Sequence, residues 1–222
     1  MKKDTSTKLL INSNGVKFIA LAGVDGSGKS TQVEKLMAAL LAKGYKVAYF
    51  HAIEFSLANR LARLLRAKKT FTPGEEKAVT KASFLTLFLR EKFMTLDSIR
   101  FLFWKRSLRL DGYDMILSDR SFYDSLINIA YRNREKKSKL IDLGIHILTT
   151  IIPKADRVFF FDLKASDIMS RSRVPEQGES YLEQKLTLYK QFAETFHFTS
   201  IDATQSEEAL LKLLITGIES GE

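Results

Sequence analysis

Hydrophobic and polar residues follow two patterns along the chain, and these predict strands and helices in turn. Short apolar runs are typical of buried strands, whereas apolar residues three and four positions apart are typical of helices that bury one face. The first pattern predicts strands at 17–22, 46–51, 115–118, 157–163 and 197–202. The second predicts helices at 29–43, 54–69, 121–134, 138–151, 166–173, 180–195 and 206–218, and one or two more within 75–110.

The alternation of strands and helices indicates the fold class. It favours an α/β protein with a five-stranded parallel sheet, helices on both faces and right-handed crossovers. Because no repeat, low-complexity tract or linker interrupts the pattern, we expect a single domain at 17–222 behind a flexible lead-in at 1–16. Ligands of such sheets bind at the carboxyl ends of the strands, near Gly23, Asp119 and Asp202 in this chain.

A glycine-rich segment between the first predicted strand and helix carries the most specific motif. Residues 23–30 are Gly-Val-Asp-Gly-Ser-Gly-Lys-Ser and fit the phosphate-binding pattern G-x-x-x-x-G-K-S/T. Its glycines let backbone N–H groups converge on one concave site, to which the helix N-terminus adds its positive dipole end. We expect Lys29 to reach the β- and γ-phosphates of a nucleotide and Ser30 to hold Mg²⁺. The expected fold is therefore the three-layer P-loop NTPase/kinase fold.

Three further observations separate the classes of P-loop protein. The N-K-x-D sequence with which most GTPases bind guanine does not occur. The third strand ends Asp119-Arg120 where a motor ATPase carries Asp-Glu, and arginine is a poor base but a good clamp for phosphate oxygens. Arg171 and Arg173 suit a lid, at about 171–180, that closes over a transferring phosphoryl group and excludes water. Together these features favour a small-molecule kinase.

The composition excludes several kinds of chemistry. The chain has 222 residues, of which 45% are hydrophobic, so it can bury a substantial core. The absence of cysteine excludes disulfides, thiolate zinc sites and cysteine nucleophiles, and it agrees with a cytoplasmic location. The longest uncharged apolar segment, 143–153, is too short to span a bilayer, so no membrane partner is expected.

The net charge of +9 has two interpretations. A basic surface can bind nucleic acid, and basic residues can also bind free nucleotides, which carry several negative charges each. No RNA-binding or zinc-finger signature accompanies the charge, so nucleotide substrates rank first and nucleic acid ranks last. The basic cluster at 132–139 is expected to be a solvated loop.

Several segments resemble the thymidylate kinase family. Residues 18–47, with the glycine-rich loop and its internal Asp25, resemble the opening of that family. Leu117-Ser118-Asp119-Arg120 resembles its Asp-Arg segment, and Arg171-Ser172-Arg173 followed by Tyr181 to Tyr189 resembles its lid and next helix. Ile201-Asp202-Ala203 resembles the end of its fifth strand, so the resemblance extends over most of 17–218.

This resemblance implies an ATP-dependent nucleoside monophosphate kinase of nucleotide biosynthesis, with dTMP as the default acceptor and Mg²⁺ as the metal. Asp119 would orient Mg²⁺ through water, together with Ser30. Asp25, Glu54 and Arg120 would contact the acceptor. The implied catalytic residues are Lys29, Arg120, Arg171 and Arg173, and the implied ATP-binding residues are Gly23, Asp25, Gly26, Ser27, Gly28, Lys29, Ser30 and Thr31.

The chain departs from the family on the acceptor side. The family carries Arg-Glu-Pro after the second strand, where residues 51–56 are His-Ala-Ile-Glu-Phe-Ser, and Ser121 replaces the aromatic residue after Asp-Arg. Two alternatives therefore stay open. One is the same donor site with another acceptor, either a nucleoside or a small metabolite. The other is a nucleotide-binding module that no longer catalyses.

Two apolar stretches in 75–110 have a structural interpretation. The helical spacing of Phe84, Leu85, Phe88 and Leu89 favours core positions. Phe101-Leu102-Phe103-Trp104 with Lys105-Arg106 is compatible with core packing, with a helical homodimer face or with a membrane-surface patch, and the first two are preferred.

Overall fold

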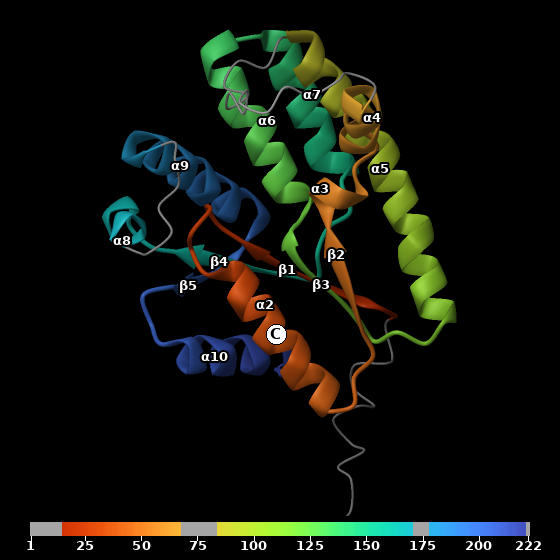
Figure 1. The fold of residues 1–222 in the computed structure, drawn as a ribbon, viewed down its shortest axis with the longest axis vertical. Coiled ribbons are helices and arrows are strands. Elements are labelled where there is room, and N and C mark those ends of the chain that lie inside the picture. The colour runs from red at the N-terminus through yellow and green to blue at the C-terminus, as the bar shows by residue number, and fades with distance from the viewer. Residues whose placement is uncertain (1–14, 68–83, 171–177, 221–222) are drawn as a thin grey trace, which may run out of the picture.

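A central parallel sheet organises the protein (Figure 1). The structure is a computed structural model that describes residues 15–67, 84–170 and 178–220. The sheet order is β2-β3-β1-β4-β5, and all neighbours are parallel, so the predicted sheet and the α/β fold class are confirmed. Most of the expected lead-in, residues 1–14, lies outside the described part of the chain. The strands are β1 (Lys17–Ala22), β2 (Val47–His51), β3 (Met115–Arg120), β4 (Arg157–Asp162) and β5 (Thr199–Asp202).

Helices cover both faces of this sheet. Figure 1 shows α2 (Lys29–Ala42) and α10 (Glu207–Glu219) on one side of it. The other side carries α5 (Phe84–Leu110), α6 (Phe122–Lys136), α7 (Lys139–Ile151) and α9 (Glu179–Phe196). Three shorter helices are α3 (Ala52–Phe55), α4 (Leu57–Ala67) and α8 (Ala165–Met169). The described part of the long segment predicted at 75–110 is one continuous helix.

The helix predicted at 54–69 is two helices that meet at Ser56. Ser56 has an extended backbone, which ends α3. The backbone N–H of Leu57 donates to both carboxylate oxygens of Asp97, at 3.2 and 3.1 Å, so this carboxylate satisfies the first N–H of α4. Asp97 belongs to α5, 40 residues later in the sequence. The single-helix prediction was wrong because a distant side chain stabilises the break.

Aromatic side chains fill the space between the sheet and α5. The ring centroid of Phe101 lies 4.8 Å from that of Phe18 and 4.7 Å from that of Phe50. Phe101 is fully buried, so the core interpretation is confirmed for this residue. Its neighbours Leu102 and Phe103 point away from the core and are 55% and 71% exposed.

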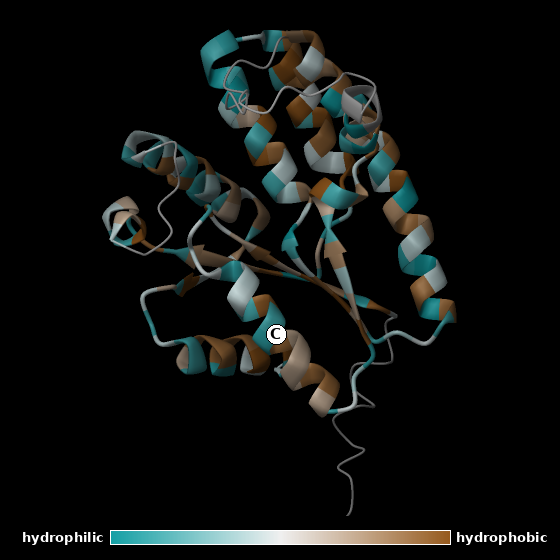
Figure 2. Ribbon diagram, in the orientation of Figure 1, coloured by the Kyte–Doolittle hydropathy of each residue, from teal (hydrophilic) through white to brown (hydrophobic). Residues whose placement is uncertain are grey.

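The core prediction was wrong for Phe84, Leu85 and Leu89, which are 44% to 61% exposed. α5 has two apolar stripes, and both have helical spacing. One stripe is buried and contains Leu87, Met94, Phe101 and Leu108. The other stripe is exposed, and Figure 2 shows hydrophobic residues along the lengths of both α5 and α7. Spacing identifies residues that share a face, but it does not identify which face meets the sheet. Within the described residues, no helix has the length and apolar character needed to cross a membrane.

A carboxyl group is buried where α5 packs against α7. Glu91 is 3% exposed, and its Oε1 atom has no hydrogen-bond partner among the described residues. A Cβ atom on Gly144 would stand only 2.4 Å from Oε2 of Glu91, so the missing side chain makes room for the carboxyl group. Burial raises the pKa of Glu91 to about 7.

We expect the free energy of unfolding to fall as the pH rises from about 5 to above 7. The folded state holds the Glu91 proton to higher pH than the unfolded state does, so stability is lost as the pH rises through this interval. At ~1.4 kcal/mol per pKa unit, the loss has an upper limit of about 3 kcal/mol. Urea unfolding between pH 5 and 8 measures it. Glu91→Gln should flatten the profile, whereas exposed Glu183→Gln should leave it unchanged. An unchanged slope in Glu91→Gln would contradict the assignment.

Candidate active site

The loop between β1 and α2 has the backbone that its sequence predicts. Gly23, Gly26 and Gly28 all have positive φ angles, of 149°, 85° and 96°. A side chain on Gly23 would also meet Ser27 Oγ at 3.1 Å and the Phe161 carbonyl oxygen at 3.3 Å. Left-handed backbone and close approach both require glycine, so the loop turns tightly from the sheet into the N-terminus of α2.

Lys29 extends over this loop from the first turn of α2. Its Nζ atom donates to the carbonyl oxygen of Val24 at 2.7 Å and to Ser27 Oγ at 3.2 Å. The side chain is buried, and this desolvation lowers the pKa of Lys29 to about 8, although neighbouring carboxylates oppose the shift. An ammonium group in this low-dielectric loop interacts strongly with anions such as nucleotide phosphates.

Ser30 and Asp119 meet beside the loop. Ser30 Oγ donates to one carboxylate oxygen of Asp119 at 2.8 Å, and the Tyr49 hydroxyl donates to the other at 2.6 Å. A hydroxyl and a carboxylate oxygen fit Mg²⁺, which takes one or two protein oxygens and completes its shell with water and substrate phosphates. The structure therefore places the two predicted metal-binding residues together. The sequence did not single out Tyr49, which orients Asp119 from β2.

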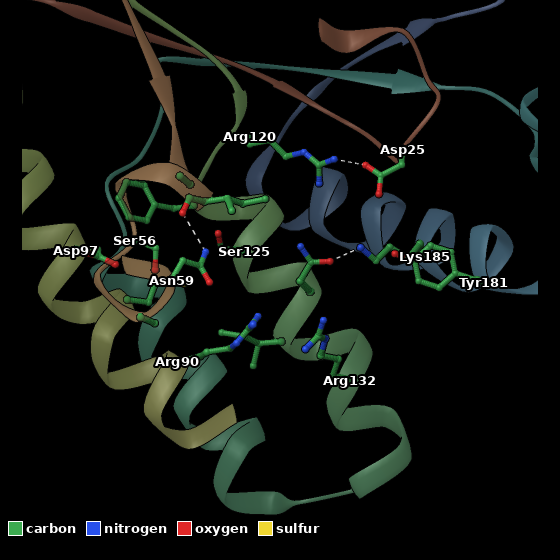
Figure 3. Close-up of a pocket in the computed structure, with 17 residues that line it drawn as sticks. Asp25, Ser56, Asn59, Arg90, Asp97, Arg120, Ser125, Arg132, Tyr181 and Lys185 are labelled. Atoms are coloured by element: carbon green, nitrogen blue, oxygen red, sulfur yellow. Dashed lines mark hydrogen bonds and ion pairs between the residues drawn. The ribbon is translucent and has the colours of Figure 1, made fainter. Parts of the chain in front are cut away.

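Asp25 of this loop and Arg120 at the end of β3 form an ion pair (Figure 3). They are 95 residues apart in the sequence, and the parallel pairing of β1 with β3 brings them together. Burial alone would raise the pKa of Asp25, but Arg120, Lys29 and Lys185 outweigh it, so the pKa of this carboxyl lies below its usual value. Asp25 is therefore an anion that keeps the Arg120 guanidinium in place.

A cavity of about 290 Å³ lies beside this ion pair (Figure 3). Its walls come from the end of β3 and from α3, α4, α5, α6 and α9. Four cations and two carboxylates of the described residues line it, namely Arg90, Arg120, Arg132, Lys185, Asp25 and Asp97. Asp97 already accepts bonds from Arg100 and Leu57, so the lining favours a negatively charged ligand.

Three residues assigned from sequence do not appear in this constellation. Glu54 is exposed and does not line the cavity, although Ile53 and Ser56 on either side of it do. Because α3 is a single short turn, neighbouring residues point in different directions. Arg171 and Arg173 lie outside the described residues, as does most of the lid segment.

Sequence reasoning missed several residues of the cavity. Arg132, expected in a solvated loop, instead lies in α6, where its Nη1 atom is buried without a hydrogen-bond partner among the described residues. Ser125, Asn128 and Arg132 share one face of α6, and Tyr181 and Lys185 share one face of α9. This spacing of polar residues was a usable signal, but a solvent-facing stripe has the same spacing.

The replacement of the family's aromatic residue by Ser121 has a local explanation. Ser121 is the N-cap of α6, and its backbone N–H and hydroxyl donate to Asp124 at 2.8 and 2.9 Å. Asp124 also accepts a bond of 2.6 Å from the buried Tyr189 hydroxyl. These contacts fix the start of α6, the helix that carries one wall of the cavity.

Comparison with known proteins agrees with this geometry. The family model described as thymidylate kinase matches residues 21–213. A thymidylate kinase of Thermosipho melanesiensis is 30% identical over 198 residues, which cover 85% of this chain and 90% of that protein. A probable thymidylate kinase of Thermococcus kodakarensis is 28% identical over 91% of this chain and 97% of its own. Another probable thymidylate kinase, from Sulfurisphaera tokodaii, is 25% identical over 87% of this chain and 91% of its own. The chain therefore belongs to the thymidylate kinase family and is a phosphotransferase of the nucleoside monophosphate kinase type.

Proposed function

We propose that this protein transfers the γ-phosphoryl group of Mg·ATP to dTMP, which yields ADP and dTDP. One observation carries the proposal. The Asp25–Arg120 pair forms a common wall between the phosphate-binding loop and the cation-lined cavity, so a donor phosphate and an acceptor phosphate can be held side by side. Family membership and the relatives' names support dTMP as the acceptor.

Positioning and electrostatics supply the catalysis in this proposal. The loop N–H groups and Lys29 hold the ATP phosphates, and Arg120 binds the acceptor phosphate. Ser30 and Asp119 hold Mg²⁺, which neutralises charge on the β- and γ-phosphates when bound. Arg171 and Arg173, between α8 and α9 in the sequence, stay predicted contributors to charge stabilisation at the transferring group.

A substrate panel tests the proposal. The purified protein is assayed for ADP release from Mg·ATP with each nucleoside monophosphate, with nucleosides and without an acceptor. We expect release that depends on dTMP. If another acceptor alone supports turnover, that acceptor replaces dTMP in the proposal. The altered segment at 51–56 is the reason for testing a panel of acceptors. ATP binding without turnover of any acceptor would instead indicate a non-catalytic nucleotide-binding module. The proposed location is the cytoplasm, since the cysteine-free composition agrees with a reducing compartment.

We also propose that the protein is a homodimer that pairs through α5 and α7. The exposed stripe of α5 has alternating steps of three, four and seven residues, which suits pairing with a second helix. α7 packs beside α5 and adds four more exposed apolar residues. An exposed apolar face that spans two neighbouring helices is typical of a two-fold interface. Its members are Leu85, Leu89, Leu96, Ile99, Phe103 and Leu110 of α5 and Leu140, Leu143, Ile147 and Ile151 of α7.

Phe103→Glu is expected to convert the dimer to a monomer, because it places a charge on the apolar stripe at a residue that is 71% exposed in one protomer. Light scattering after size exclusion measures the mass. Leu213→Glu is the matched control, since Leu213 is 44% exposed but lies on α10, across the sheet. A monomeric wild-type protein would contradict the proposal. Binding to lipid vesicles by a monomer would favour the membrane-surface alternative.

A further inference from the structure

Lys185 is a buried lysine on α9 whose side chain points into the cation-lined cavity beside the Asp25–Arg120 pair (Figure 3). It is 4% exposed. Its Nζ atom donates to Oδ1 of Asn128 on α6 and lies 5.9 and 5.3 Å from the ring centroids of Tyr131 and Tyr181. These contacts hold the ammonium group within the same cavity as the Arg120 guanidinium, which comes from β3.

The charge of Lys185 has no carboxylate of its own within the described residues. Among the described residues its Nζ atom forms no ion pair, and the two carboxylates that act on its charge are engaged elsewhere: Asp25 pairs with Arg120, and Asp124 accepts bonds from Tyr189 and Ser121. An ammonium group has three N–H donors, and Asn128 accepts one of them. A buried cation with spare donors is costly unless a partner compensates it.

The charges around Lys185 act in both directions. Burial is the largest effect. Together with the neighbouring cations Arg120 and Lys29, it lowers the pKa of Lys185 to about 8. Asp25 and Asp124 oppose this effect. An anion that enters the cavity would stabilise the charged ammonium group. A phosphate dianion would do so most strongly, because it can accept bonds from two cations at once.

We propose that Lys185 is an acceptor-binding residue whose ammonium group, together with the Arg120 guanidinium, holds the monophosphate group of the acceptor. The two cations approach from α9 and β3, so the phosphate is bound from two sides next to the nucleotide-binding loop. This inference rests on the proposed kinase function. It adds a specific expectation, which is that Lys185 recognises the phosphate end of the acceptor rather than the base.

The test compares Lys185→Met, which keeps the aliphatic stem, with Lys185→Arg, which keeps the charge. Lys185→Met is expected to raise KM for dTMP at least tenfold and to change KM for ATP less than twofold. Lys185→Arg should retain most of the affinity for dTMP. In the wild-type protein, KM for dTMP should rise above pH 8 as Lys185 loses its proton, and this rise should be absent in Lys185→Arg.

Ligand binding separates phosphate recognition from a purely structural role. Calorimetry with dTMP and with thymidine is expected to show a loss of affinity in Lys185→Met for dTMP alone. Equal losses for both ligands, or no loss for either, would overturn the inference. If Lys185→Met does not fold, Asn128→Asp serves instead, because a new carboxylate beside Lys185 should neutralise it and also raise KM for dTMP. An unchanged KM there would overturn the inference as well.

The substrate panel keeps this inference distinct from the proposed function. If another monophosphate replaces dTMP, the same variants are tested with that nucleotide and its nucleoside, because phosphate is the shared group. A wild-type protein that binds no nucleoside monophosphate would overturn both proposals. Wild-type turnover together with an unchanged KM for the monophosphate in Lys185→Met would overturn the Lys185 inference alone.

Discussion

Replacement of Lys29 by methionine is expected to lower kcat for phosphoryl transfer by about 10²–10³-fold, the loss typical of removing one preorganised charge-stabilising donor. Lys29 is 5% exposed and bonds to the loop through the Val24 carbonyl oxygen and Ser27 Oγ. Water screens its charge little, so its interaction with the transferring phosphoryl group is strong. No other lysine of the described residues occupies this loop. Steady-state ADP release with dTMP at saturating ATP measures the effect.

Two comparisons make the Lys29 result interpretable. Methionine keeps the aliphatic stem, so thermal unfolding should show a folded protein even though two hydrogen bonds are lost. Lys35→Met is the matched control, because Lys35 lies on the same helix but is partly exposed and pairs with Glu207 on α10. We expect it to retain wild-type turnover. If Lys29→Met kept more than a tenth of the wild-type kcat, the donor-site assignment would be wrong.

The parts of this protein that were predictable from sequence are those specified by local chemistry. Gly23 and Gly28 are the two fixed glycines of the motif, and their positive φ angles are the backbone conformation for which the motif needs glycine. The five strands were predictable because apolar runs buried on both faces differ plainly from amphipathic helices. The meeting of Ser30 with Asp119 followed from one topological rule, that parallel strand ends share an edge.

What the sequence did not predict depends on contacts between distant segments. The break at Ser56 is stabilised by Asp97, and no pattern near Ser56 indicates that partner. Lys185 faces a cavity only because α9 packs against α6, so its neighbours in sequence could not distinguish it from a surface lysine. The exposed stripe of α5 was mistaken for core because an exposed apolar face and a core face have the same helical period.

Arg120→Met is expected to lower kcat/KM for dTMP by about 30- to 1000-fold. The guanidinium is partly buried and is held by Asp25, and the proposed function uses it as a donor to the acceptor phosphate. Truncating one member of a buried, hydrogen-bonded charge pair costs roughly 2–5 kcal/mol, and because this pair is only partly buried we take about 2–4 kcal/mol, which corresponds to 30- to 1000-fold. Initial rates over a range of dTMP concentrations at saturating ATP measure this loss of kcat/KM. Arg134→Met, in the last turn of α6, is the control.

A double variant decides whether Arg120 binds substrate or only neutralises Asp25. If neutralisation were its whole role, removing the aspartate charge as well would restore activity, because no uncompensated carboxylate would remain. We expect the activity of Asp25→Asn/Arg120→Met to stay within about threefold of that of Arg120→Met, since the cation for the phosphate is still missing.

The stability of the pair gives an independent check. Because Arg120 contributes to the lowered pKa of Asp25, the pair stabilises the fold at neutral pH and loses this effect as the pH falls and Asp25 is protonated. The difference in unfolding temperature between wild type and Arg120→Met should therefore shrink at low pH. Recovery of activity in the double variant would place the acceptor phosphate away from Arg120.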